Sequence, residues 1–125
     1  MKTIILFAMI FCHIVDDYYL QGWLASGKQK DWWKKQGDNP LYENDYIIAL
    51  ICHSFSWSFM INLPLMLYLL YVNNLNPIFY SISIVVNMVI HAVVDNLKAN
   101  VKIINLIQDQ SIHLIQIAIT FLIFI

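Results

Sequence analysis

The chain has 125 residues, of which 60% are hydrophobic and only 12% are charged, and its formal net charge is −1. A soluble domain carries about 25% charged residues, and so short a chain cannot bury this much apolar surface away from water. The composition therefore predicts one membrane-embedded domain, and its slightly negative charge excludes general nucleic-acid binding, which needs a basic surface.

The first segment begins like a signal peptide, with one lysine and then an apolar run from Ile4 to Cys12. It continues through His13, Asp16 and Asp17 without the small-x-small site at which a leader is cleaved. We therefore expect residues 3–20 to form a retained transmembrane helix, near the minimum length that spans a bilayer.

Residues 21–44 form the one long polar stretch, in which lysines alternate with Trp23, Trp32 and Trp33. Lysine and tryptophan together are typical of a segment at the level of the lipid headgroups. We expect an interfacial helix over residues 22–36, ended by the breaker sequence Gly37-Asp38-Asn39-Pro40.

Three further apolar stretches predict transmembrane helices over residues 45–72, 78–97 and 103–125. Pro64 lies inside the first of them, a position that membrane helices tolerate. The predicted fold is all-α, a four-helix up-down transmembrane bundle that occupies residues 1–125 as a single domain. The two connections that carry lysines, 21–44 and 98–102, are expected in the cytoplasm, which leaves both termini outside.

All four histidines lie in apolar segments, and three of them have an aspartate four residues away. This spacing places both side chains on one face of a helix. In an up-down bundle, all four histidines and the three paired aspartates fall in the half of the membrane nearest the lysine-bearing loops. We therefore predict one buried polar site made of His13, Asp17, His53, His91, Asp95, Asp109 and His113.

A charged side chain near the centre of a membrane helix costs about 2.5–3.5 kcal/mol on insertion scales. A divalent cation would resolve this cost, because it keeps carboxylates ionised and imidazoles neutral. Mixed histidine and aspartate ligands suit zinc, manganese or iron, and seven candidates suffice for one or two ions. Asp95 or Asp109, if left outside the metal ligands, would act as a general base.

Other readings of this cluster stay open: a structural network of histidine–aspartate hydrogen bonds, a proton or ion path, and bis-histidine haem. Asp16 follows His13 by three residues and can reach the same face. Gln21 is a candidate to support the ligands because it follows Asp17 by four residues, and Asn87, Gln108 and Gln110 are weaker candidates. Lys98 follows Asp95 by three residues, so it either pairs with Asp95 or extends to the headgroups. The two cysteines belong to no CxxC motif, so a disulfide framework is not expected.

The order of these residues resembles a known family. The pattern runs from His13-x-x-x-Asp17-Tyr-Tyr-Leu-Gln21 through His53 and His91-x-x-x-Asp95-x-x-Lys98 to Asp109-Gln110-x-x-His113. It resembles the small phage and bacterial membrane proteins grouped as domain of unknown function 3307, over nearly the whole chain. It is also loosely similar to membrane-bound proteins described as metal-dependent hydrolases. The resemblance implies a bacterial inner membrane, or that of a phage-infected host, but no settled activity.

Two functions are therefore carried forward from the sequence. The first is a metal-dependent hydrolase that acts on a lipid or a lipid-linked phosphoester, with membrane lipids as its partners. The second is a non-catalytic phage or bacterial membrane protein, which conducts ions or protons or binds a partner as a subunit. Self-association into a homo-oligomer is compatible with both.

Overall fold

The computed structural model describes residues 1–37 and 39–125, and these residues are helical with no strand among them. This confirms the all-α class. The long helices are α1 (Lys2–Val15), α4 (Asp45–Tyr71), α5 (Pro77–Asn96) and α6 (Leu106–Phe124). Helix α1 continues as the π-helical turn η1 (Asp16–Leu20), and α5 continues as the π-helical turn η3 (Leu97–Val101). The short elements are α2 (Leu24–Gly27), α3 (Lys30–Gln36) and the 3₁₀ turn η2 (Pro40–Tyr42).

The ends of the helices follow local signals in the sequence. Asn76 caps α5 by accepting hydrogen bonds from the two following backbone N–H groups, and Pro77 occupies the first helical position. Asn105 and Gln108 form a reciprocal capping box at the start of α6. Gly22 has a φ of +51°, a left-handed conformation that favours glycine and ends the first helical segment.

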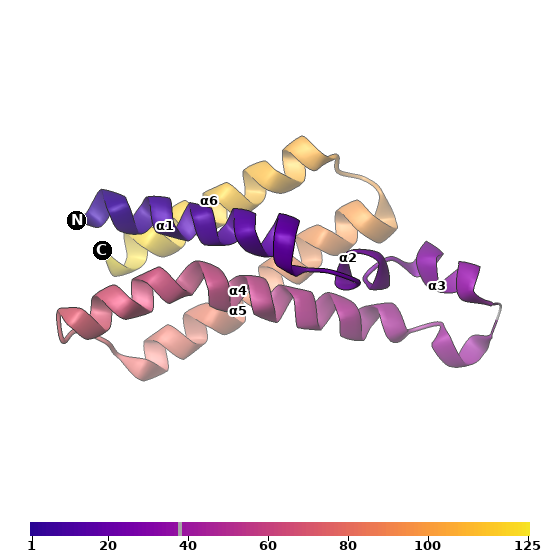
Figure 1. Ribbon diagram of the computed structural model, residues 1–125, viewed down its shortest axis with the longest axis horizontal. Helices are drawn as coiled ribbons and strands as arrows, with labels where there is room; N and C mark the ends of the chain where they lie inside the picture. The colour runs from indigo at the N-terminus through magenta and orange to yellow at the C-terminus, as the bar shows by residue number, and fades with distance from the viewer. Residues whose placement is uncertain (38) are drawn as a thin grey trace.

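The long helices run along the longest axis of the molecule (Figure 1). Both chain ends lie at one end of the molecule, beside the turn that joins α4 to α5 (Figure 1). The segment with α2 and α3 and the connection from α5 to α6 lie towards the opposite end. Helix α4 contacts all three other long helices and has its most extensive contacts with α1 and α5. Helix α4 is therefore the central helix, against which the other long helices pack.

Four helical stretches are long and apolar enough to cross a membrane: Lys2–Leu20, Pro40–Tyr71, Pro77–Val101 and Leu106–Phe124. The distribution of side chains matches that setting. In the described part of the chain, fifteen polar or charged residues are buried against eleven hydrophobic ones. Large aliphatic side chains such as Ile107 and Leu122 are about three-quarters exposed, at 76% and 75%. A lipid solvent explains this arrangement, because apolar side chains lose nothing by facing it.

The interior has an apolar part and a polar part, and a smaller group of hydrogen-bonded polar side chains, Asn87, Gln116 and Thr120, lies between α5 and α6. The apolar part, towards the chain ends, is a cluster of buried residues from α1, α4 and α6: Ile5, Met9, Trp57, Ile61, Leu65, Leu69 and Ile117. The polar part lies towards α2 and the α5–α6 connection. Trp57 stands at the boundary, because its ring stacks on His91 with centroids 4.1 Å apart.

Candidate metal centre

The seven predicted site residues lie together in one buried cluster. His13 comes from α1, Asp17 from η1, His53 from α4, and the remaining four from α5 and α6. None is more than 7% exposed. Each makes at least one contact of 3.8 Å or less with another member of the set. The predicted convergence of these side chains is therefore what the structure shows.

His53 is the centre of the first group that could hold a metal, Asp17, His53 and His91. Its Nε2 lies 3.3 Å from Asp17 Oδ1 and 3.2 Å from His91 Nε2. Ligands of a tetrahedral zinc ion, at about 2.0–2.1 Å from the metal, are about 3.3 Å from one another. The two distances from His53 Nε2 therefore match the spacing of ligands around one ion, and one ligand atom from each of the three residues lies within 4.8 Å of the others.

The second group that could hold a metal is His91, Asp95 and His113. Asp95 faces both groups, because its Oδ2 lies 3.3 Å from His53 Nε2 and its Oδ1 lies 3.6 Å from His113 Nε2. His91 also belongs to both, and its Nδ1 lies 3.2 Å from His113 Nδ1. The two groups are therefore neighbours that share the His91 imidazole, and Asp95 of the second group also contacts His53 of the first.

His13 lies at the edge of the cluster, and both of its ring nitrogens have hydrogen-bond partners. Trp57 Nε1 donates to His13 Nδ1 at 2.7 Å. His13 Nε2 therefore carries the ring proton and donates to Gln110 Oε1 at 3.0 Å. His13 is a member of neither three-residue group. Its ligand role stays a prediction, and its observed contacts are those of a residue that supports Gln110.

Asp109 also stands outside both groups, beside His113. Its Oδ1 lies 3.4 Å from His113 Nε2, and its Oδ2 accepts hydrogen bonds from Lys98 Nζ at 2.6 Å and Gln110 Nε2 at 3.0 Å. Lys98 therefore pairs with Asp109 and not with Asp95. The amide of Gln110 also donates to Asp17 Oδ2 at 3.1 Å. Gln110 thus joins Asp17, Asp109 and His13 across the α1–α6 side of the cluster.

Asp16 belongs to the buried cluster although the spacing favoured Asp17. It is 1% exposed, accepts a hydrogen bond from Ser56 Oγ at 2.6 Å, and lies 3.8 Å from His53 Nδ1. Adjacent side chains point about 100° apart on an α-helix, so one of the two aspartates would normally face outward. The π-helical turn η1 widens the helix at this point and accompanies the burial of both.

Lys28 enters the cluster from the polar connection, where nothing in the sequence pattern suggested it. It is 6% exposed, and its Nζ lies 2.5 Å from Asp95 Oδ2. The preceding Gly27 permits this approach, because a Cβ there would lie 3.3 Å from Ala49 Cβ on α4 and 2.2 Å from the Trp23 ring. The Gly27 carbonyl accepts a hydrogen bond from Trp33 Nε1 at 2.6 Å, which ties α3 to the same place.

The chemistry of the cluster fits a bound cation. In the part of the chain that the structure describes, Asp17 Oδ1, Asp109 Oδ1 and His113 Nε2 are buried without a hydrogen-bond partner. Such groups are costly in a dry interior. Four aspartates and two lysines, with neutral histidines, leave two negative charges: Asp16, Asp17, Asp95 and Asp109 against Lys28 and Lys98. One divalent cation would neutralise them.

A groove on the surface adjoins this cluster. It lies between α1 and α6, has a volume of about 510 Å³, and is lined by Ile10, His13, Ile14, Tyr18, Tyr19, Gln110 and Leu114. His13 and Gln110 both line the groove and contact the aspartates of the cluster, since Gln110 donates to Asp17 and Asp109 and His13 lies 3.8 Å from Asp17.

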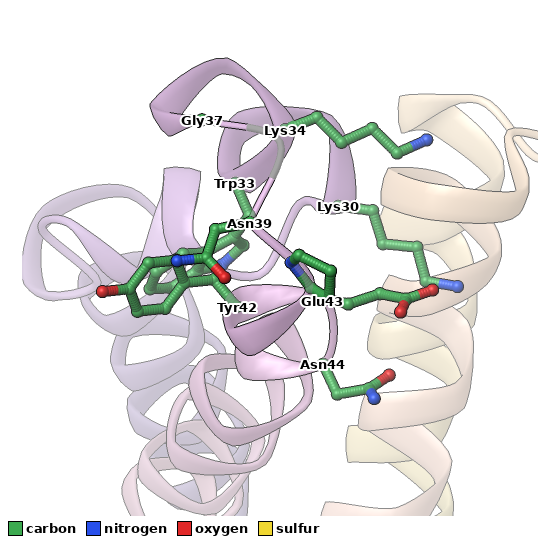
Figure 2. Close-up of a pocket in the computed structure, with 9 residues that line it drawn as sticks. Lys30, Trp33, Lys34, Gly37, Asn39, Tyr42, Glu43 and Asn44 are labelled. Atoms are coloured by element: carbon green, nitrogen blue, oxygen red, sulfur yellow. The ribbon is translucent and has the colours of Figure 1, made fainter.

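A second hollow, of about 340 Å³, lies apart from the cluster, between α3 and the turn η2. Figure 2 shows Trp33, Asn39 and Tyr42 on one side of it and Lys30 with Glu43 on the other, while Lys34 extends away. The Trp33 and Tyr42 rings are stacked with centroids 6.3 Å apart. None of its lining residues belongs to the histidine–aspartate cluster.

Comparisons of the chain with protein families, with curated proteins and with solved structures found no match. Both cysteines are free, as expected from their spacing. The site therefore has to be interpreted from its own geometry. This geometry defines a helical protein with four membrane-length helices around buried histidine–aspartate groups that could hold a metal ion.

Proposed function

We propose that this protein is an integral membrane protein with a divalent metal centre, and that it hydrolyses a lipid or a lipid-linked phosphoester. The observation that carries the proposal is the set of three nitrogen and oxygen atoms around His53 Nε2 at 3.2–3.3 Å. Asp17, His53, His91, Asp95 and His113 would hold the metal. Zinc, manganese and iron suit these ligands, and the two adjacent groups offer places for one or two ions.

A metal in this position supplies Lewis-acid chemistry and lowers the pKa of a nearby water. Hydrolysis adds the oxygen of water to phosphorus and breaks the bond to the leaving alcohol. Asp109 is the better placed of the two predicted catalytic aspartates to accept the proton of that water, because it is outside both metal groups and its Oδ1 has no hydrogen-bond partner among the described residues. The proton then passes from Asp109 to the leaving oxygen, so that the alcohol is released in its protonated form.

We further propose the arrangement of the protein in its membrane. The four long helices span the bilayer as an up-down bundle, the lysine-bearing ends face the cytoplasm, and both termini lie outside. The α2–α3 segment lies at the headgroup level, which its lysines and tryptophans support. A lipid substrate approaches through the groove between α1 and α6, and the pair His13 and Gln110 must move aside to admit it. We also propose that the chain is related to the proteins grouped as domain of unknown function 3307 and that it can form a homo-oligomer.

The first experiment measures metals bound to the detergent-purified protein by mass spectrometry. One or two equivalents of a transition metal are expected for the unchanged protein. The His91→Ala/Asp95→Asn variant is expected to lose them while it stays helical. Glu43→Gln, an exposed carboxylate away from the cluster, serves as the control and is expected to retain the metal. A full complement of bound metal in the double variant would overturn the assignment of these residues as ligands.

Conduction of ions or protons is the second candidate, and the chain of close imidazoles His53, His91 and His113 favours it. Ile61 and Leu65 are fully buried apolar side chains beyond these imidazoles, and the buried polar side chains Asn87, Gln116 and Thr120 continue from them as a hydrogen-bonded group between α5 and α6. Flux across proteoliposome membranes that is lost in His91→Ala, without bound metal, would select conduction over hydrolysis.

A further inference from the structure

Two lysines in the cluster have no place among the proposed metal ligands. Lys28 Nζ lies 2.5 Å from Asp95 Oδ2, and Lys98 Nζ lies 2.6 Å from Asp109 Oδ2. The two lysines come from different ends of the sequence, one from the end of α2 and the other from η3. Both of their aspartate partners also approach His113 Nε2, at 3.6 and 3.4 Å. Each ammonium group is therefore paired with an aspartate whose other oxygen faces the same imidazole, that of His113.

Lys28 competes with a metal for the same oxygen atom. Asp95 Oδ2 contacts Lys28 Nζ at 2.5 Å and His53 Nε2 at 3.3 Å. A metal held by Asp95 and His53 would lie about 2.0–2.2 Å from this oxygen, and the ammonium would be its close neighbour. Two cations so close repel each other strongly where water is excluded. The Asp95 carboxylate supplies one negative charge for these two cations, so a further anion that contacts both would lower the repulsion.

We propose that Lys28 and Lys98 form an anion subsite beside the metal centre, and that this subsite selects a phosphoryl group. The inference rests on the proposed function and narrows its substrate from esters in general to phosphoesters. A phosphoester carries a negative charge and several acceptor oxygens, whereas a carboxylic ester is neutral and needs no ammonium donor. The chain has no arginine, so lysine is the side chain that supplies a fixed positive charge to phosphate.

The test uses the protein in detergent and two titrations. The metal-free protein is titrated with the metal alone, and the metal-loaded protein is titrated with inorganic phosphate, both by calorimetry. The variants are Lys28→Gln, Lys98→Gln and the control Lys102→Gln. Lys102 is a suitable control because it also pairs with an aspartate at 2.6 Å, but its side chain is 62% exposed and lies outside the cluster.

The affinities for metal and for phosphate are expected to respond differently to these substitutions. Loss of a competing ammonium leaves metal affinity unchanged or raises it in Lys28→Gln. Loss of a charge-assisted hydrogen bond weakens phosphate binding about tenfold or more in Lys28→Gln and in Lys98→Gln. Lys102→Gln is expected to match the unchanged protein in both titrations. A residue that served only to hold the fold together would weaken metal and phosphate binding in parallel.

Several results would overturn the inference. If the metal-loaded protein binds no phosphate, the anion subsite is refuted and the proposed metal centre is unaffected. If the protein binds no metal, both the subsite and the metal centre are refuted. Unchanged phosphate affinity in both cluster variants, or a parallel loss of metal and phosphate, would also end it. Circular dichroism checks the fold, and Lys98→Gln decides the question if Lys28→Gln does not fold.

The source of the phosphoryl group is separated by competition. Displacement of phosphate by micellar phosphatidic acid, but not by phosphatidylcholine, would support a lipid headgroup in the subsite. Phosphate that phosphatidic acid does not displace, yet that still requires Lys28 and Lys98, would support a soluble phosphate ester.

Discussion

Two lysine–aspartate pairs in this protein have nearly the same length and very different surroundings. Lys28 and Asp95 are 2.5 Å apart, with side chains 8% and 1% exposed. Lys102 and Asp31 are 2.6 Å apart, with side chains 62% and 54% exposed. A double-mutant cycle on each pair therefore measures the effect of burial at constant distance. The variants are Lys28→Met and Asp95→Asn in the first pair, and Lys102→Met and Asp31→Asn in the second.

Asp95→Asn alone is expected to lower the free energy of unfolding by about 3–5 kcal/mol, because it leaves the Lys28 ammonium buried without a counter-ion. Within the described residues, Lys28 forms no other ion pair. Lys28→Met alone should cost less, because Asp95 keeps His53 and His113 within 3.6 Å. The double variant should recover most of the loss, so that the coupling free energy is about 2 kcal/mol or more. The exposed pair should show a coupling free energy much smaller than that of the buried pair.

The measurement is made on metal-free protein, so that the loss of a ligand does not enter the result. Unfolding is followed by circular dichroism as sodium dodecyl sulfate is added to mixed micelles. Additive effects of Lys28→Met and Asp95→Asn would refute the reasoning, because they would mean that the two charges do not interact in the folded protein. Equal coupling in both pairs would refute the role of burial.

Three further predictions follow from single contacts. Gln110→Ala should lower metal affinity about 10- to 100-fold, measured by competition with a chelator, because it removes the hydrogen bond to Asp17. Trp57→Phe should cost about 1–3 kcal/mol of stability, measured in the same dodecyl sulfate titration, because it retains an aromatic ring but leaves His13 Nδ1 without its donor. The hydrogen bond from Lys102 lowers the pKa of Asp31, so the pair stabilises the fold above the ordinary aspartate pKa and loses this effect as the pH falls through the lowered value. Lys102→Met should return the pKa of Asp31 to its ordinary range in an NMR titration.

The apolar runs were sufficient to predict four helices of membrane length, because such runs have no other stable conformation in a bilayer. The expected start at residue 78 lies one residue from the observed start at Pro77, whereas the helix expected from residue 103 begins only at Leu106, after the Asn105 cap. The two π-helical turns were not visible. A π turn arises when the gain from packing particular side chains exceeds the cost of a wider helix. That balance depends on neighbouring helices, and the sequence of one helix does not contain it.

The spacing of histidines and aspartates predicted the members of the cluster, because one-turn pairs must share a helix face. The partners of the lysines could not be predicted in this way. Lys98 follows Asp95 by three residues, yet it lies in the π-helical turn η3 and pairs with Asp109 on α6. Lys28 reaches Asp95 across 67 positions of the sequence, through a close approach that depends on Gly27. A contact between residues so far apart in the sequence leaves no periodic pattern from which it could be predicted.

The charges of the cluster connect the number of metal ions to the substrate. With one divalent ion, four aspartates and two lysines, the site is neutral, and an added phosphate would be unpaired. With two ions, one in each histidine group, the site carries two excess positive charges, which a phosphate dianion would neutralise. Because uncompensated charge is costly in a membrane interior, the second ion and the phosphoryl group should bind together. Phosphate should therefore raise the metal content of the purified protein from one equivalent towards two, and a constant metal content at saturating phosphate would contradict this linkage.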